Sequence, residues 1–342
     1  MTPSPSRSLL IDLLKVVGSQ LIVLHHLSIY APMGEPLAQA WPRTVDLLAD
    51  DARLAVQVFL VVGGYLAGRS LARPKGTLGR LLLQRYLRLV PPLAAALALV
   101  LAATALVPAA QRPDWISPWP TPWTLLAHLL LLQDVLGIPS LSAGAWYVAI
   151  DLQLFALTAL VATQAQRVPG PLARGPAAWI VAAATLASTW VFSRDADLDA
   201  WAPYFIAPYG LGVLAAWSRQ GRRVTLLFGA VVALQLLDVA IEPRARPLLA
   251  VATAVALWAA ADVRARETRL TRALARGSEI SYALFVSHFA VIVVATAAWI
   301  RMEMSGLTAA IAAALLAWIL ATVIASVLHR VVPVPGHRSR TS

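Results

Sequence analysis

Residues 280–299 are ISYALFVSHFAVIVVATAAW, a stretch without a charged side chain. About 20 apolar residues in a helix cross the roughly 30 Å hydrocarbon core of a bilayer. Such segments recur along the chain, which is 59% hydrophobic and 13% charged, with a mean hydropathy of +0.71. Soluble domains do not have this composition. The sequence therefore predicts an all-α integral membrane protein.

Ten segments have the length and hydropathy of transmembrane helices, which predicts a single membrane domain over residues 1–342. Another apolar stretch, 125–136, is too short to cross and contains His128, Gln133 and Asp134, so we expect a re-entrant or interfacial helix there. The predicted spans are 9–30, 54–71, 89–107, 145–163, 177–193, 201–217, 224–240, 247–261, 280–299 and 306–328.

The basic residues predict which side of the membrane each loop faces. With ten spans and a cytoplasmic N-terminus, most of the 28 Lys and Arg residues lie in cytoplasmic segments, including 219–223 and 264–276. This agrees with the excess of positive charge in cytoplasmic loops of membrane proteins, whereas an eleventh span at 125–136 would turn both segments outward. We therefore expect both termini in the cytoplasm, with a short tail over 329–342.

Composition excludes several kinds of chemistry. The formal charge of +11 is explained by cytoplasmic loops rather than by nucleic-acid binding. The absence of cysteine excludes disulfides, thiolate metal ligands and a cysteinyl-acyl intermediate, and no metal site is expected. Asp12 and Lys15 interrupt the first apolar run, so we expect it to remain as a helix rather than to be cleaved as a signal. The Pro- and Trp-rich stretch 113–123 is typical of an outer interfacial loop.

Ionisable groups within spans are costly and are therefore candidates for function. In the first span, Lys15 and His26 are eleven residues apart, close to three helical turns, and share a face. Either His25 or His26 could be a general base that titrates near neutrality. For the histidines the alternative is interfacial hydrogen bonding. For Asp12 and Lys15 it is an ion pair with Lys15 extended toward the cytoplasm.

Arg85 and Arg88 lie three residues apart just before the predicted third span. Guanidinium groups bind phosphate in a bidentate manner, so this pair is a candidate for holding the nucleotide phosphates of an acyl donor. The alternative is an ordinary basic cytoplasmic loop.

Later spans add further candidates. Asp151 lies about two turns into the fourth span, after Trp146, and could orient a histidine or form a helix–helix hydrogen bond. Ser281, Tyr282 and His288 lie in the ninth span and are predicted to support the site from behind. The segment Gly63-Gly64-Tyr65 favours close helix packing.

Five segments in this order resemble acyltransferase family 3, the membrane family of bacterial surface-polysaccharide O-acetyltransferases. Three positions depart from the family pattern: Lys15 stands for the commoner Arg, Asp151 for Glu, and Gly63 for Ser. Lys15-x10-His26, with Ile11-Asp12 before it, resembles the family's basic-x10-His motif. Residues 59–66 (FLVVGGYL) resemble its Phe-x-x-Ser-Gly-Tyr/Phe segment, and Arg85-Tyr86-Leu87-Arg88 resembles its Arg-x-x-Arg motif. Residues 146–155 resemble its Trp-x4-Glu segment, and residues 281–288 resemble its Ser-Tyr-x5-His motif.

The resemblance implies an acyl-CoA donor, usually acetyl-CoA, and a hydroxyl of a cell-surface or exported carbohydrate as the acceptor. It implies that His26 is the essential histidine and that Arg85 and Arg88 serve the donor; Lys15 is a further candidate for that role. It also implies a multi-pass protein of the bacterial inner membrane, with polysaccharide-assembly proteins as partners. We expect no C-terminal hydrolase-like domain of the kind that some members carry.

Two other classes of function fit the same sequence features. One is a transporter or flippase of lipid-linked sugars, which would also need many spans and a few buried polar residues. The other is an inactive family member that binds an acyl donor, since Asp151 replaces the usual Glu. If the protein is an enzyme, direct attack of the acceptor and a route through an acyl-histidine both remain open.

Overall fold

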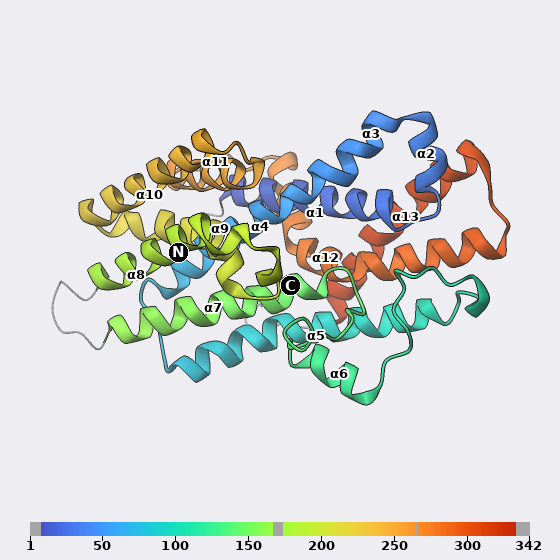
Figure 1. Cartoon of the computed structure of the whole chain (residues 1–342), viewed down its shortest axis with the longest axis horizontal. Helices are drawn as coiled ribbons and strands as arrows, with labels where there is room; N and C mark the ends of the chain where they lie inside the picture. Colours follow the sequence, from blue (N-terminus) through green and yellow to red (C-terminus); the bar gives the residue numbers. More distant parts are fainter. Residues whose placement is uncertain (1–7, 167–173, 264–265, 333–342) are drawn as a thin grey trace. The chain divides into compact units, whose positions relative to one another are not determined.

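A computed structural model describes residues 8–166, 174–263 and 266–332 (Figure 1). These residues form helices and connecting turns, with no strand among them. The longer helices are α1 (Leu9–Ile29), α4 (Ala55–Leu71), α5 (Leu78–Thr104), α7 (Ala145–Ala165), α8 (Arg174–Trp190), α9 (Ala202–Trp217), α10 (Arg222–Ile241), α11 (Ala245–Ala259), α12 (Arg269–Arg301) and α13 (Gly306–Val331). Among the shorter ones are α2 (Gly34–Ala40), α3 (Pro42–Asp46), α6 (Pro122–Leu129) and the single turn η1 (Leu47–Asp51).

Within the described ranges, 8 helical segments are long and apolar enough to cross a membrane. This confirms the all-α membrane fold. The segments are Leu9–Ile29, Pro42–Leu71, Leu78–Thr104, Ala145–Ala165, Gly175–Arg194, Arg222–Ile241, Arg269–Arg301 and Gly306–Val331. The other two predicted spans form α9 and α11, which have 16 and 15 residues and are short for a crossing. The stretch 125–136 contributes to the short helix α6, as expected.

Two helices begin well before the apolar windows that predicted them. α5 starts at Leu78 rather than near residue 89, and α12 starts at Arg269 rather than near residue 280. Arg85 and Arg88 therefore lie inside α5, with Pro91 and Pro92 farther along the same helix. The early turns of both helices carry arginines, so hydropathy detects only their later, apolar part. Residues 333–342 of the predicted tail and 264–265 of the predicted loop lie outside the described residues.

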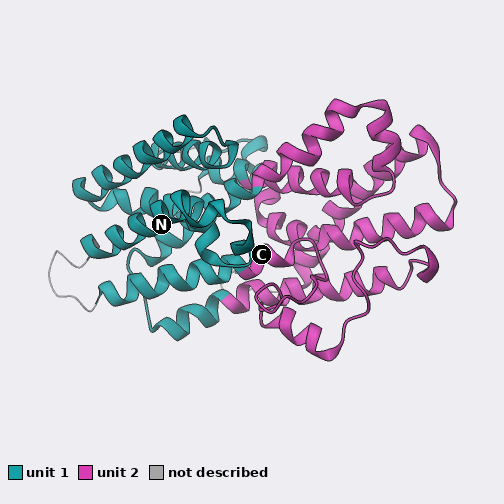
Figure 2. Ribbon diagram, in the orientation of Figure 1, with its two compact units in different colours: residues 1–14, 56–85, 150–275 teal, residues 15–55, 86–149, 276–342 magenta. Residues whose placement is uncertain are grey.

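The chain divides into two compact units, coloured separately in Figure 2. Unit 1 consists of residues 1–14, 56–85 and 150–275, and unit 2 of residues 15–55, 86–149 and 276–342. Helices α1, α4, α5, α7 and α12 contribute residues to both.

Unit 1 is built around α9, which packs against α8, α10 and α11 and is buried along most of its length. Glycines allow α4 to approach α9 closely. A Cβ at Gly64 would overlap the backbone oxygen of Tyr209, and one at Gly68 would lie 3.0 Å from the backbone oxygen of Val213. The indole of Trp217 donates to the carbonyl of Gly68 at 2.9 Å. Small residues four apart are typical of such contacts between membrane helices. The sequence predicted close helix packing at Gly63-Gly64-Tyr65, and the contact with α9 confirms this for Gly64.

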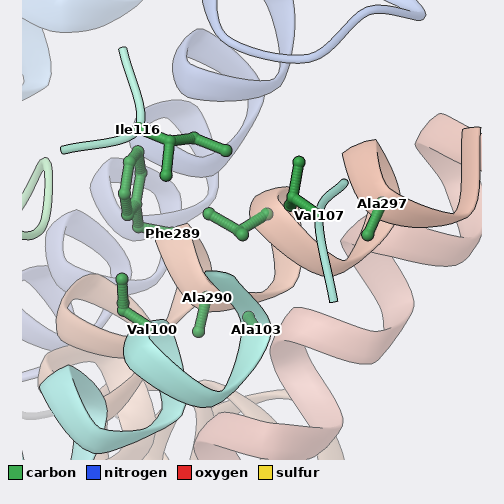
Figure 3. Packing of buried hydrophobic residues seen from close by; sticks show 8 residues of the cluster. Val100, Ala103, Val107, Ile116, Phe289, Ala290 and Ala297 are labelled. Atoms are coloured by element: carbon green, nitrogen blue, oxygen red, sulfur yellow. The ribbon is translucent and has the colours of Figure 1, made fainter. Parts of the chain in front are cut away.

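Unit 2 contains an apolar cluster that joins α5, α12 and the loop between α5 and α6 (Figure 3). Phe289 and Ile116 lie in this cluster, so the loop is held against α12 by a buried side chain rather than only at its ends. The other members are Val100, Ala103, Val107, Ala290, Val293 and Ala297.

Candidate active site

Two contacts in unit 2 align α1 with α12 and bring His26 to His288. Near the start of α1, the ammonium of Lys15 donates to the carbonyl of Ser278 at 2.7 Å. Eleven residues later, Nδ1 of His26 lies 2.8 Å from Nε2 of His288. Because both contacts advance in the same order along the two helices, α1 and α12 run parallel. This agrees with the predicted topology, in which the first and ninth spans start from the same side.

The hydrogen bonds of His288 fix its neutral tautomer. Nδ1 of His288 lies 3.1 Å from the carbonyl of Leu284. Since a carbonyl oxygen only accepts hydrogen bonds, Nδ1 carries the proton, and Nε2 of neutral His288 is an acceptor.

The same reasoning then fixes the tautomer of His26. Its Nδ1 must donate to Nε2 of His288, because that nitrogen holds only a lone pair. Neutral His26 therefore has its unprotonated nitrogen at Nε2, which is the atom able to accept a proton from a substrate. His288, predicted only to support the site from behind, is the side chain that orients His26 within unit 2.

His25 points elsewhere. Its Nδ1 lies 3.1 Å from the carbonyl of Leu48 in η1 and must donate to it. The rings of His25 and His26 are 4.8 Å apart and tilted by 52°. Both residues are buried, each with an exposed fraction of 9%. Hydrogen bonding therefore distinguishes them: His25 fastens the η1 turn to α1, and His26 is held by another imidazole.

A group of aromatic side chains lies beside His26. Tyr30, one turn after His26, packs with its ring 5.4 Å from that of His26 and nearly parallel to it. Phe289 meets Tyr30 edge-on at 5.7 Å, and Trp115 contacts both rings, at 5.4 Å from Tyr30 and 5.8 Å from Phe289. Burial raises the pKa of Tyr30 above its ordinary value, so its phenol stays protonated at neutral pH.

Tyr30 and Trp115 were not predicted to belong to the site. The spacing of Tyr30 from His26, four residues along one helix, is a signal that could have found it. Trp115 lies in the stretch 113–123, which was predicted to be an interfacial loop, and its contact with Tyr30 depends on tertiary structure alone. We name Tyr30, Trp115 and Phe289 the aromatic wall.

The hydroxyls of Ser281 and Tyr282 donate hydrogen bonds to backbone carbonyls. The hydroxyl of Ser281 donates to the carbonyl of Ser278 at 2.8 Å, the same oxygen that Lys15 contacts. The phenol of Tyr282 donates to the carbonyl of Leu89 at 2.7 Å and so ties α12 to α5. Trp146 meets Tyr147 edge-on at 6.0 Å, and Tyr147 contacts Phe285, which neighbours His288. These residues support the elements that carry the histidines.

Asp151 belongs to unit 1 and has an arginine as its partner. Nη2 of Arg85 lies 2.6 Å from each oxygen of the Asp151 carboxylate, and Nε lies 2.9 Å from Oδ2. The side chain of Asp151 is 6% exposed and that of Arg85 is 18% exposed. The guanidinium also lies over the ring of Phe155 at 5.1 Å. The structure thus pairs Arg85, a candidate for binding the donor, with Asp151, a candidate for orienting a histidine.

The remaining candidates lie on the same helices. Arg88, in the unit 2 part of α5, is exposed. Asp12 in α1 and Tyr65 in α4 are buried and belong to unit 1.

Comparison with known proteins gives a family. Residues 9–330 match the family model of acyltransferase family 3, described as an acyltransferase domain. Searches of curated proteins and of solved structures gave no significant match to this chain.

Proposed function

The chain belongs to acyltransferase family 3, and from that premise we propose that it transfers an acyl group, typically acetyl, from cytoplasmic acyl-CoA to a carbohydrate hydroxyl. The carbohydrate is a cell-surface or exported glycan, and the enzyme resides in the bacterial inner membrane. Family membership supports the membrane acyltransferase activity. The observation that carries the mechanism is the hydrogen bond of 2.8 Å between His26 and His288.

His26 is the proposed general base. Its Nε2 takes the proton of the acceptor hydroxyl while the hydroxyl oxygen attacks the thioester carbonyl carbon. The carbon–sulfur bond then breaks, and the thiol of CoA leaves with the proton that His26 received. The products are the acylated carbohydrate and free CoA. Neither a cysteine nor an acyl-enzyme is needed for this balance.

His288 stabilises the charged form of His26 in this reaction. When His26 becomes an imidazolium, its Nδ1–H donates from a charged ring to the lone pair of His288, and charge-assisted hydrogen bonds are the stronger ones. The carbonyl of Leu284 holds His288 in the accepting tautomer throughout. The pair thus combines a base with a fixed acceptor behind it.

For the donor we propose that Arg85, Arg88 and Lys15 attract the phosphates of CoA. Arg88 is exposed, and Arg85 forms an ion pair with Asp151. A phosphate that binds Arg85 must therefore share or displace the carboxylate, which makes Asp151 a competitor for the donor's charge. The ammonium of Lys15 donates a hydrogen bond to the carbonyl of Ser278.

The test uses purified full-length protein in detergent with acetyl-CoA. Because the chain has no cysteine, a thiol reagent detects released CoA without background from the protein. We expect slow release that accelerates when a glycan fraction from the expressing cells is added. A transporter or an inactive donor-binding member would release no thiol above the rate of a protein-free control.

A further inference from the structure

We infer that Trp115 is a positioning residue of the proposed reaction, closing the aromatic wall over His26 so that an acceptor hydroxyl, not water, reaches the base. This inference rests on the proposed function and adds to it the means by which ester formation is favoured over hydrolysis. Water and a sugar hydroxyl offer the same O–H group to His26, so the enzyme has to discriminate by access.

The geometry links Trp115 to His26 through one ring. The ring of Tyr30 stacks on that of His26 with a tilt of only 12°, and Trp115 contacts both Tyr30 and Phe289. Phe289 directly follows His288 in α12. Trp115 is thus linked to His26 through Tyr30, and it also packs against the residue that follows His288.

The loop that carries Trp115 is anchored directly after this residue. Ile116 is 5% exposed within the apolar cluster of Figure 3, and its N–H donates to the carbonyl of Pro113 at 3.0 Å. The hydroxyl of Ser117 donates to the carbonyl of Ser140 at 2.7 Å. The indole is thus presented by a fixed backbone, as positioning requires.

Tyr30 and Trp115 pack against the apolar cluster but remain partly exposed. The sequence predicts that this end of α1 and the loop at 113–123 face the outer side, where an exported glycan would arrive. Closing a site against water suppresses hydrolysis of reactive groups.

In the competing reaction, water gives its proton to His26 and attacks the thioester carbon, the carbon–sulfur bond breaks, and acetate and free CoA are released. Opening the wall favours this route. For Trp115→Ala we expect the ratio of glycan ester to acetate to fall by about tenfold to a hundredfold, the range that small misplacements of reacting groups produce. Total CoA release should fall much less.

The experiment measures both products from labelled acetyl-CoA in membranes that express the full chain at matched levels. Trp115→Phe, which keeps a ring, should hold the ratio near that of the wild type. Trp115→Leu keeps an apolar side chain without a ring and should lower the ratio of glycan ester to acetate. This variant tests the inference if Trp115→Ala does not accumulate. Trp119→Ala is the matched control, since Trp119 lies in the same loop, is 54% exposed and stacks on Arg112 instead.

The outcomes separate this inference from the function on which it rests. If the wild type forms both products and the Trp115 variants keep its ratio, even at lower rates, Trp115 is merely structural and the inference is wrong. If the wild type forms neither product, the proposed function itself is wrong, and the inference falls with it.

Discussion

At the scale of single residues, one carbonyl oxygen determines which nitrogen of His26 is basic. The carbonyl of Leu284 fixes the proton of His288, and His288 in turn fixes that of His26. The sequence predicted His26 as a candidate from its spacing with Lys15. It could not predict the partnership with His288, because the two residues are 262 positions apart and only tertiary packing brings them together.

A second buried histidine, His128 in α6, gives a prediction about stability. Its Nδ1 donates to the carbonyl of Thr124 at 2.8 Å, and its Nε2 accepts from the N–H of Leu141 at 3.0 Å. A proton on Nε2 would break the second bond. Burial lowers the pKa of His128 below its ordinary value, although the nearby charge of Asp134 opposes this.

The folded state therefore binds this proton less readily than the unfolded state. Stability from His128 should be fully present above about pH 6.5 and fall below it, by at most about 1.4 kcal/mol per pH unit. Thermal unfolding between pH 7.5 and 5 measures this. His128→Gln, which can accept a hydrogen bond but does not titrate, should flatten the pH dependence. An equally steep dependence in that variant would show that other groups cause it.

At the scale of elements, the apolar windows located the helices well but not their ends. Hydropathy marks the part of a helix that lies in lipid, whereas α5 and α12 extend beyond it through turns that carry arginine. For α9, hydropathy predicted a transmembrane span, but its 16 residues are short for crossing the membrane. Its burial among α4, α8, α10 and α11 depends on glycines whose partners the sequence alone does not identify.

The contact between α4 and α9 can be tested with two alanine substitutions. Gly64→Ala places a methyl group against the backbone oxygen of Tyr209, so we expect a loss of about 1–3 kcal/mol, as for other overpacked sites. Gly229→Ala in α10 meets no atom within 4 Å and should be neutral or stabilise by about 0.4–1 kcal/mol. Thermal unfolding midpoints in detergent provide the measurement. Equal midpoints for the two variants would argue against a tight crossing at Gly64.

At the scale of the whole molecule, the sequence predicted the all-α membrane fold and the family, both of which are confirmed. It gave no sign of two compact units, because several helices contribute residues to both and no linker marks a boundary between them. The orientation in the membrane, with both termini in the cytoplasm, stays a prediction from the distribution of charge.

The absence of cysteine makes that orientation accessible to labelling, since any introduced cysteine is the only one. Asp197 and Arg223 are exposed and lie on either side of α9. In intact cells a membrane-impermeant thiol reagent should label Asp197→Cys at the outer side but not Arg223→Cys, which should react only after the membrane is opened. Labelling of both in intact cells would mean that α9 does not cross.

The central claim is that His26, oriented by His288, is the base of an acyl transfer. The most direct measurement is the incorporation of label from acetyl-CoA into glycan by membranes that contain matched amounts of wild type, His26→Ala or His25→Ala. We expect His26→Ala to lose about 10²- to 10⁴-fold, the contribution typical of a general base, and His25→Ala to lose much less. Incorporation by His26→Ala equal to that of the wild type would contradict the account.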